Sequence, residues 1–189
     1  ARAAARLKPV VVVKAGRHTE SARAAASHTG ALAGTDEVYN AAFLRAGMLR
    51  VMDMQALFDA VETLARAHPF AGDRLVILTN GGGMGVMATD VLIDKKGQMA
   101  ELSSETIDRL NRVLPSTWSH GNPVDIIGDA PPGRYADALQ AVLDDKGVDA
   151  LLVLNCPTAV ASSTEAAQVV VDTLKQSGAK AASRGIFTS

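Results

Sequence analysis

A histidine surrounded by small residues is the first feature of this sequence that could carry chemistry. His28 lies in the segment ASHTGALAG (26–34), and its neighbours Ser27, Thr29 and Gly30 have short or no side chains. Such neighbours predict a loop that can move and that lets the imidazole enter a narrow site. Neutral imidazole is a nucleophile near physiological pH, so His28 is a candidate for covalent catalysis on a loop formed with these neighbours.

Other roles for His28 are weighed against the nucleophile. A metal role lacks partners, because Cys156 is the single cysteine and no group of His, Cys and Asp has the spacing of metal ligands. A serine triad is weak, because no serine lies in a G-x-S-x-G elbow. We therefore expect no metal site, and the alternative to the nucleophile is a histidine solvated on a mobile surface loop.

The glycine-rich segment NGGGMG (80–85) is the second candidate site. It lies between the apolar run RLVILT (74–79) and a helical pattern at 86–96. Glycines let a ligand approach the main chain, and the N–H groups that open a helix favour an anion such as phosphate. The segment is neither a Walker A motif nor a G-x-G-x-x-G fingerprint, and a turn whose glycines serve packing alone is the alternative. The predicted phosphate-binding residues are Asn80, Gly81, Gly82, Gly83, Met84 and Gly85.

Alternating strands and helices must position these two segments. Apolar runs without polar alternation are typical of strands buried on both faces, so the pattern predicts an α/β fold with parallel sheets and flanking helices. We expect strands at 9–13, 49–52, 74–79, 98–102, 124–128 and 148–155, and the start of one at 185–189. We expect helices from Thr35 to a stop at Gly47, over 57–67, over 86–96, from an N-cap at Ser103, over 133–145, and from an N-cap at Ser162.

The domain organisation is expected to be incomplete. The segment HPFAGDR (68–74) interrupts the pattern with Pro and Gly and is the best candidate for a linker. The part before it has too few strands for a sheet of its own. The chain opens on a helical tail and stops where a strand begins, so we expect an excerpt from a longer polypeptide.

Composition limits the classes of function. Apolar residues make up 48% of the 189 residues and charged residues 21%, which suffices for a sizeable core. A net charge of −1 argues against nucleic-acid or membrane-surface binding. A single cysteine and the lack of a signal segment or a long apolar run predict a soluble protein of the reducing cytoplasm.

Taken together, these motifs resemble a known family. The segments SHTGALAGTDEVYNAAFLRAGMLRV, ILTNGGGMGVMATDVL and GNPVDIIGDA are similar to those of NDP-forming acyl-CoA synthetases. This family includes ADP-forming acetate–CoA ligase and, more distantly, succinyl-CoA synthetase, and the same assembly also occurs fused to GNAT protein-lysine acetyltransferases. The resemblance spans nearly the whole chain.

The resemblance implies a flavodoxin-like fold and a reaction. Residues 1–67 would be the C-terminal part of a first CoA-ligase lobe, incomplete here, and 74–189 a second lobe. In this family acyl-CoA and phosphate give an acyl phosphate, and a histidine carries the phosphoryl group to ADP; His28 matches that histidine. Asp125 and GNP (121–123) match a family motif in which a structural role is equally expected. The substrate-loop candidates, for which an ordinary turn is the alternative, are Thr158, Ala159 and Val160.

The resemblance also implies cofactors and partners. CoA and ADP or ATP with magnesium would be bound by CoA-binding and ATP-grasp domains that this chain does not contain, with phosphate at the glycine turn. The expected partners are an acyl-CoA, phosphate, a small carboxylic acid and those missing domains, with further copies of the chain as an option. A regulatory, ligand-binding region of a GNAT acetyltransferase is the alternative function, and a lobe used only for assembly is a third.

Overall fold

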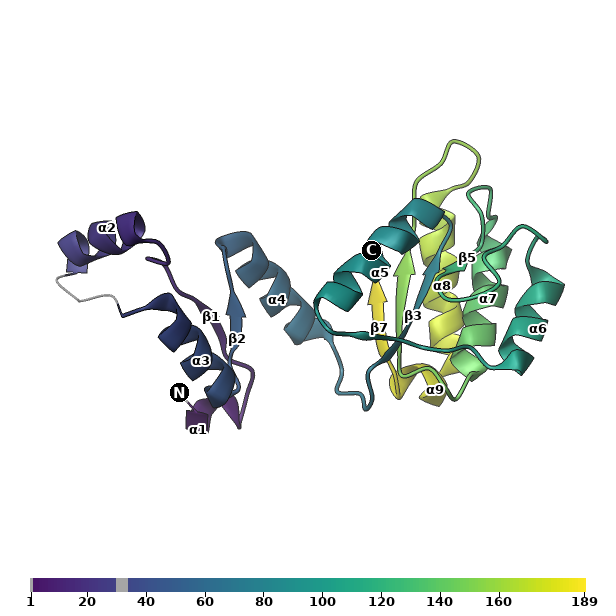
Figure 1. Ribbon diagram of the computed structural model, residues 1–189. Helices are drawn as coiled ribbons and strands as arrows, with labels where there is room; N and C mark the ends of the chain where they lie inside the picture. Colours follow the sequence, from purple (N-terminus) through teal and green to yellow (C-terminus); the bar gives the residue numbers. More distant parts are fainter. Residues whose placement is uncertain (1, 30–33) are drawn as a thin grey trace. The chain divides into compact units, whose positions relative to one another are not determined.

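The computed structural model describes residues 2–29 and 34–189, and of His28 and Thr29 it describes the backbone alone. The chain forms two compact units, Ala1–Arg66 and Ala67–Ser189. Each unit is a separate arrangement of helices around parallel strands (Figure 1).

The first unit contains a short parallel sheet flanked by helices. Strand β1 pairs with β2 in parallel, with Val11 opposite Leu49 and Val13 opposite Val51. These are the strands of the first unit within the part of the chain that is described, in line with the expected shortage. The elements are α1 (Arg2–Ala5), β1 (Val11–Val13), α2 (Thr19–Thr29), α3 (Asp36–Ala46), β2 (Leu49–Val51) and α4 (Met54–Arg66).

The histidine segment is helical where the sequence predicted a loop. Helix α2 runs through His28 and ends at Thr29. The helix contains a run of alanines, and alanine has the highest helix propensity of any residue type. At the start of the helix, Oγ of Ser21 accepts a hydrogen bond from the N–H of His18 at 3.2 Å. The expectation of a loop over residues 26–29 was therefore wrong, while Gly30 lies outside the described residues.

Helix α3 begins and ends as the sequence predicts. Thr35 occupies the N-cap position, although its hydroxyl makes no capping hydrogen bond. Gly47 has a φ of 72°, and its N–H bonds to the carbonyl of Leu44 while that of Met48 bonds to Phe43. This pair of bonds is the Schellman arrangement, in which glycine takes the left-handed conformation without steric cost.

The second unit is a five-stranded sheet between helices. The strand order is β4-β3-β6-β7, and all pairings are parallel. β4 pairs with the first two residues of β3, and β5 pairs with its last two. Helices α6, α7 and α8 cover one face of the sheet and α5 covers the other (Figure 1). The strands are β3 (Arg74–Thr79), β4 (Gln98–Met99), β5 (Val124–Asp125), β6 (Ala150–Leu154) and β7 (Gly185–Thr188). The helices are α5 (Gly82–Asp94), α6 (Ser104–Val113), α7 (Pro132–Asp144), α8 (Ser163–Ser177) and α9 (Ala179–Ala182).

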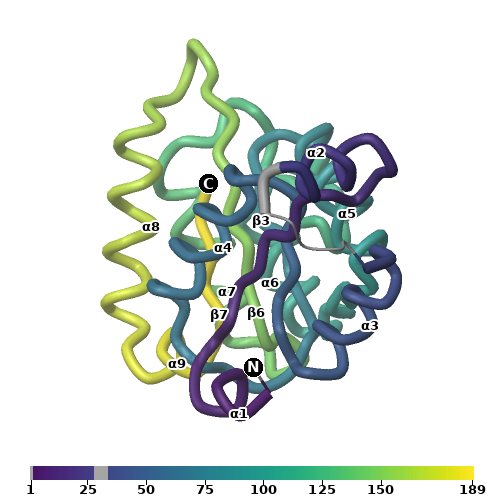
Figure 2. Tube along the Cα trace, turned by 90° about the vertical axis from the view of Figure 1, so that its left-hand side faces the viewer, coloured from purple at the N-terminus to yellow at the C-terminus, as the bar shows by residue number. Residues whose placement is uncertain are grey.

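The central strand β3 explains the position of the core. Val76 and Leu78 belong to the cluster that also contains Leu139 of α7 and Leu151 of β6, while the intervening Ile77 is equally inaccessible. The strand is thus buried on both faces, as its apolar sequence predicts. In Figure 2, β6 and β7 run side by side, with α8 next to them along the edge of the unit.

Several element boundaries differ from the sequence expectation. Helix α5 begins at Gly82 instead of residue 86, because Gly81 takes the extended N-cap conformation and the following glycines enter the first helical turn. The strands expected at 98–102 and 124–128 are reduced to two residues each. Among the described residues, no helix combines the length and apolar character needed to cross a bilayer.

Candidate functional site

The N-terminus of α5 lies at the carboxyl end of β3. The first intrahelical bond runs from the N–H of Gly85 to the carbonyl of Gly81 at 3.1 Å, and the N–H of Gly81 bonds to Oγ1 of Thr79 at 3.0 Å. The N–H groups of Gly82, Gly83 and Met84 have no hydrogen-bond partner among the described residues. Free N–H groups at this end of the helix dipole favour an anion.

Packing accounts for some of these glycines and leaves one unexplained. A Cβ on Gly81 would overlap Sγ of Cys156, and a Cβ on Gly82 would lie 2.6 Å from Oδ2 of Asp125. A Cβ on Gly85 would be less tightly confined, at 3.1 Å from Cβ of Pro123 and from Cγ2 of Thr79. A Cβ on Gly83, by contrast, would meet no atom within 4 Å. The helix start is therefore flanked by side chains at Gly81 and Gly82 and open at Gly83.

The side chain of Asn80 links two strands of the second unit. Its side chain is buried, with 3% of the residue exposed, and it exchanges two hydrogen bonds with the backbone of Cys156. Nδ2 donates to the carbonyl at 2.9 Å, and Oδ1 accepts from the N–H at 2.7 Å. The side-chain amide thus ties the end of β3 to the end of β6, and a contribution of Asn80 to phosphate binding stays a prediction.

The predicted substrate loop follows β6 as a tight turn. Thr158 forms an isolated antiparallel bridge with Ala161. Val160, at the tip of the turn, is 74% exposed, and Ala159 is also exposed. Oγ1 of Thr158 is buried and has no hydrogen-bond partner in the described part of the chain. A buried hydroxyl without a partner is uncommon and needs a physical explanation. A Cβ on Gly128 would lie 3.9 Å from Cγ2 of Thr158, which places this turn beside the loop after β5.

Asn122, the middle residue of the GNP motif, positions neighbouring backbone through its side chain. It fills the gap on β3 between β4 and β5: Oδ1 accepts from the N–H of Ile77 at 3.0 Å. Nδ2 donates to the carbonyls of Leu75 at 2.8 Å and Ala100 at 3.0 Å. The GNP motif thereby replaces missing strand pairing, which supports the structural role weighed for it.

Asp125 comes two residues after Pro123 and is also held tightly. Its N–H donates to Oγ of Ser119 at 2.9 Å, and Ser119 in turn donates to the carbonyl of Pro123 at 2.5 Å. Oδ1 of Asp125 accepts from the N–H of Ile127 at 2.9 Å. The carboxylate is therefore fixed next to the start of α5.

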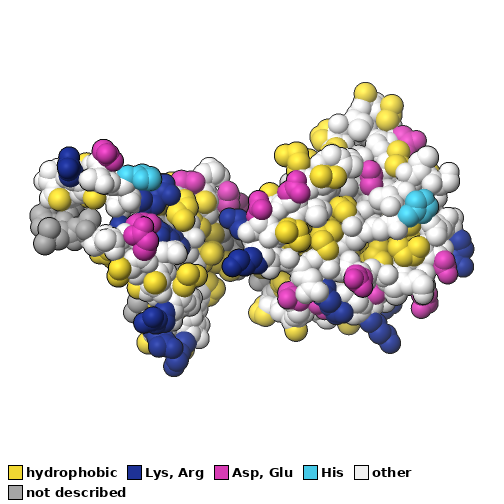
Figure 3. Space-filling view, in the orientation of Figure 1, with side chains coloured by type: hydrophobic (Ala, Val, Ile, Leu, Met, Phe, Trp, Pro, Cys, Tyr) yellow, Lys and Arg dark blue, Asp and Glu magenta, His cyan; other side chains and the backbone are white. Residues whose placement is uncertain are grey.

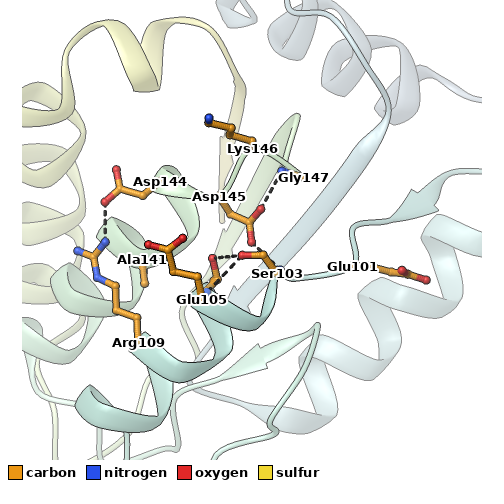
Figure 4. Close-up of a pocket in the computed structure, with 10 residues that line it drawn as sticks. Glu101, Ser103, Glu105, Arg109, Ala141, Asp144, Asp145, Lys146 and Gly147 are labelled. Atoms are coloured by element: carbon orange, nitrogen blue, oxygen red, sulfur yellow. Dashed lines mark hydrogen bonds and ion pairs between the residues drawn. The ribbon is translucent and has the colours of Figure 1, made fainter.

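Two of the hollows in the described part of the chain lie away from this helix start. One of about 390 Å³ at the start of α6 is lined by acidic side chains together with the basic Arg109 and Lys146 (Figure 4). There Asp145 accepts the N–H groups of Ser103 at 2.8 Å and Gly147 at 2.7 Å. Burial would raise the pKa of Asp145, but bonds from Thr106 and these backbone groups outweigh it and lower the pKa. This carboxylate thus serves to join α6 to the end of α7. The other hollow, of about 430 Å³ in the first unit, is lined in part by Arg17.

The outer side of α5 is unusually apolar. Met87 is 69% exposed, and Val86, Val91 and Ile93 are each more than half exposed. Figure 3 shows hydrophobic side chains gathered on the face of the second unit that carries this helix. In the described residues no cluster of three or more His, Cys, Asp and Glu side chains has the arrangement of a metal site.

Family models match both units. The succinyl-CoA ligase-like flavodoxin domain matches residues 1–64, and the Ligase-CoA domain matches residues 75–189, more than half of the chain. The chain belongs to the Ligase-CoA domain family.

Relatives of this Ligase-CoA domain chain include ADP-forming acetate–CoA ligases. It is 40% identical over 173 residues to acetate–CoA ligase [ADP-forming] I subunit alpha of Pyrococcus furiosus, covering 92% of this chain and 37% of that subunit. It is 43% identical over 171 residues to acetate–CoA ligase [ADP-forming] I of Archaeoglobus fulgidus, covering 90% of this chain and 25% of that enzyme. The chain thus spans well under half the length of the curated relatives it matches.

A solved structure confirms the fold. Dinucleotide-forming acetyl-coenzyme A synthetase 1 of Ca. Korarchaeum cryptofilum, in complex with phosphate and ADP, is 38% identical and superimposes with a TM-score of 0.89. The match covers 98% of this chain and 40% of that one. The predicted α/β, flavodoxin-like CoA-ligase fold and the resemblance to NDP-forming acyl-CoA synthetases are therefore confirmed.

The histidine segment of this Ligase-CoA chain is described in part. The backbone of His28 and Thr29 lies in the last turn of α2, and their side chains are outside the description. Ser27 is exposed, and its hydroxyl donates to the carbonyl of Ala24 at 2.7 Å. The roles of His28, Ser27, Thr29 and Gly30 remain predictions.

Proposed function

We propose that this chain is part of an NDP-forming acyl-CoA synthetase, which converts an acid, CoA and ATP to acyl-CoA, ADP and phosphate. The observation that carries the proposal is the free N–H row at the start of α5 in a chain of the Ligase-CoA family. The names of the relatives, ADP-forming acetate–CoA ligases, support the same reaction class. An acid–thiol ligase needs a place for the phosphate that leaves ATP, and this helix start has the chemistry of one.

We propose His28 as the phosphoryl carrier. In the direction of ATP synthesis, a neutral imidazole nitrogen attacks the phosphorus of an acyl phosphate. The bond from phosphorus to the acyl oxygen breaks, and the carboxylate leaves. An oxygen of ADP then attacks the phosphohistidine, which restores the imidazole and gives ATP. Ser27, Thr29 and Gly30 would provide small neighbours for a ring that must approach and leave.

We assign the phosphate to the backbone of Gly82, Gly83 and Met84, with Gly81 and Gly85 shaping the turn. Preorganised donors of this kind are worth on the order of 3–4 kcal/mol when charge develops at their ligand. Thr158, Ala159 and Val160 are proposed to contact the acyl group, a role supported by the unpartnered hydroxyl of Thr158.

The remaining assignments follow from this proposal. Residues 1–67 would belong to a first ligase lobe and residues 74–189 to a second, with CoA, nucleotide and magnesium bound by further domains of the whole protein in the cytoplasm. The relatives reported above are ligases, and nothing among them supports the acetyltransferase alternative.

An activity assay on a protein that also carries CoA-binding and ATP-grasp domains tests the proposal. Given acetyl-CoA, ADP, phosphate and magnesium, it should make ATP, and His28→Ala should abolish synthesis. His68→Ala, which removes an exposed histidine from the segment before β3, is the matched control and should retain it. Full activity in His28→Ala would refute the assigned role.

The isolated chain provides a second test. Mixed with ADP, phosphate and acetyl-CoA, it should make no ATP, because residues 1–189 supply no nucleotide domain under this proposal. Appreciable synthesis by the chain alone would contradict the division of labour among domains.

A further inference from the structure

The carboxylate of Asp125 is a negatively charged hydrogen-bond acceptor beside the start of α5, where free backbone N–H groups favour an anion. Its Oδ1 is occupied by the N–H of Ile127, whereas Oδ2 accepts no hydrogen bond from any described residue. A Cβ on Gly82 would lie 2.6 Å from this Oδ2. Because Cα–Cβ bonds in a helix tilt toward its N-terminus, Oδ2 lies on the side of Gly82 where the free N–H groups emerge.

The position of the carboxylate is fixed from several sides. Asp125 is paired with Thr79 across β5 and β3, and Ser119 binds its N–H. Asn122 anchors the preceding residues through two hydrogen bonds to β3 and a third to Ala100. Ile127, whose N–H binds Oδ1, has a φ of 70°, an uncommon conformation for a β-branched residue. Such a conformation persists when surrounding bonds hold it. The carboxylate of Asp125 is therefore held in place when an anion binds.

This arrangement distinguishes between oxyanions of similar size and charge. An anion bound by the N–H groups of Gly82 and Gly83 places another of its oxygens near Oδ2 of Asp125. An oxygen that carries a proton can donate to the carboxylate, whereas an oxygen without one is repelled by it. A site that pairs with a ligand hydroxyl rejects an analogue that lacks it, because the acceptor is then left without a partner.

We propose that Asp125 makes the anion site selective for a protonated oxyanion, hydrogen phosphate, over a fully deprotonated one such as sulfate. The proposal rests on the function proposed above and adds a specificity-determining residue to it. The backbone N–H groups bind the anionic oxygens, and Oδ2 accepts the hydrogen bond of the P–O–H group. Phosphate, the ion that an ADP-forming ligase must handle, is thereby separated from sulfate.

The test is a titration of the 189-residue chain with phosphate and with sulfate at mildly alkaline pH, where both are dianions. Shifts of the amide signals of Gly82, Gly83 and Met84 in 1H–15N spectra report binding at the helix start. We expect phosphate to bind about tenfold or more tightly than sulfate, since hydrogen bonds to charged groups are of that strength. Asp125→Asn should bring the two affinities to within a few-fold, because the amide can donate to either ion.

Asp129→Asn is the matched control. Asp129 lies in the same loop, is exposed and pairs with Arg134 at 2.6 Å, so its loss should leave the preference for phosphate unchanged. Hydrogen arsenate and selenate give a test on the unaltered chain: arsenate, which carries a proton, should bind like phosphate, and selenate like sulfate.

The outcomes separate this inference from the function on which it rests. If neither phosphate nor sulfate shifts these amides, the anion site itself is wrong. If both ions bind with equal affinity to the unaltered chain, the site stands and the role of Asp125 is wrong. Retention of the phosphate preference in a folded Asp125→Asn variant, or an arsenate affinity equal to that of selenate, would also overturn the assignment.

Discussion

Replacement of Asn122 by alanine should destabilise the second unit strongly. The substitution removes the acceptor of the Ile77 N–H and the donor to the carbonyls of Leu75 and Ala100. The carbonyl of Leu75 keeps a partner, because the N–H of Ala100 also donates to it at 2.9 Å. The N–H of Ile77 and the carbonyl of Ala100 are left without one, in residues that are 0% and 3% exposed.

The magnitude follows from these two orphaned groups. A buried polar group without a partner costs about 1–3 kcal/mol, so the free energy of unfolding should fall by about 2–6 kcal/mol. Domains of this size are stable by about 5–15 kcal/mol, so the variant should lose a large part of its stability. A loss of about 3 kcal/mol corresponds to a fall in Tm of roughly 10 °C for a unit of this length.

Urea unfolding followed by tryptophan fluorescence is the assay. Trp118 is the single tryptophan and is 2% exposed in the second unit, so its emission reports on this unit alone. Gln176→Ala removes an exposed amide for which no hydrogen bond is described, and it should change stability by less than about 0.5 kcal/mol. A loss in Asn122→Ala no larger than that of this control would refute the claim that Asn122 replaces strand pairing.

Three further substitutions test the packing around two glycines near the start of α5 and the ion pair of Asp149. Gly81→Ala should lower the free energy of unfolding by about 1–3 kcal/mol, because the new Cβ would overlap Cys156. Cys156→Ala should relieve this loss in the double variant, so additive losses in urea unfolding would contradict the overlap. Gly83→Ala meets no atom, so it should be neutral or stabilise the helix by up to about 1 kcal/mol; a loss like that of Gly81→Ala would mean the position is confined. Hydrogen bonds from Arg74, at 2.7 Å, hold the pKa of Asp149 well below its usual range. A carboxyl group whose pKa is lowered in the folded state adds stability that is present above its unfolded pKa of about 3.9 and is lost as pH falls. Asp149→Asn should therefore flatten the acid side of a plot of the urea midpoint against pH. An unchanged plot would exclude this linkage.

Local patterns were sufficient for most of the fold. The N-caps at Ser103 and Ser162 are confirmed, since their hydroxyls accept the N–H groups of Thr106 at 3.2 Å and Glu165 at 3.3 Å. Capping depends on residues within one helical turn, and apolar periodicity depends on an element's own sequence. The α/β order of elements could therefore be predicted without tertiary information.

The side-chain roles could not be predicted in the same way. Asn80 bonds to Cys156 and Asn122 to Ile77, pairs separated by 76 and 45 residues. Nothing in the local sequence indicates which distant backbone group an amide will meet. The prediction of a loop over residues 26–29 was wrong for a local reason. The small residues that suggested a loop include alanines, which favour a helix.

The most direct test of the proposed chemistry is the fate of labelled phosphate in a protein that carries this chain with CoA-binding and ATP-grasp domains. After incubation with radiolabelled phosphate and acetyl-CoA, without ADP, the protein should carry an acid-labile, base-stable label on the peptide that contains His28. His28→Ala should carry none, and addition of ADP should move the label into ATP. Label that persists in His28→Ala, or that maps to another residue, would contradict the account.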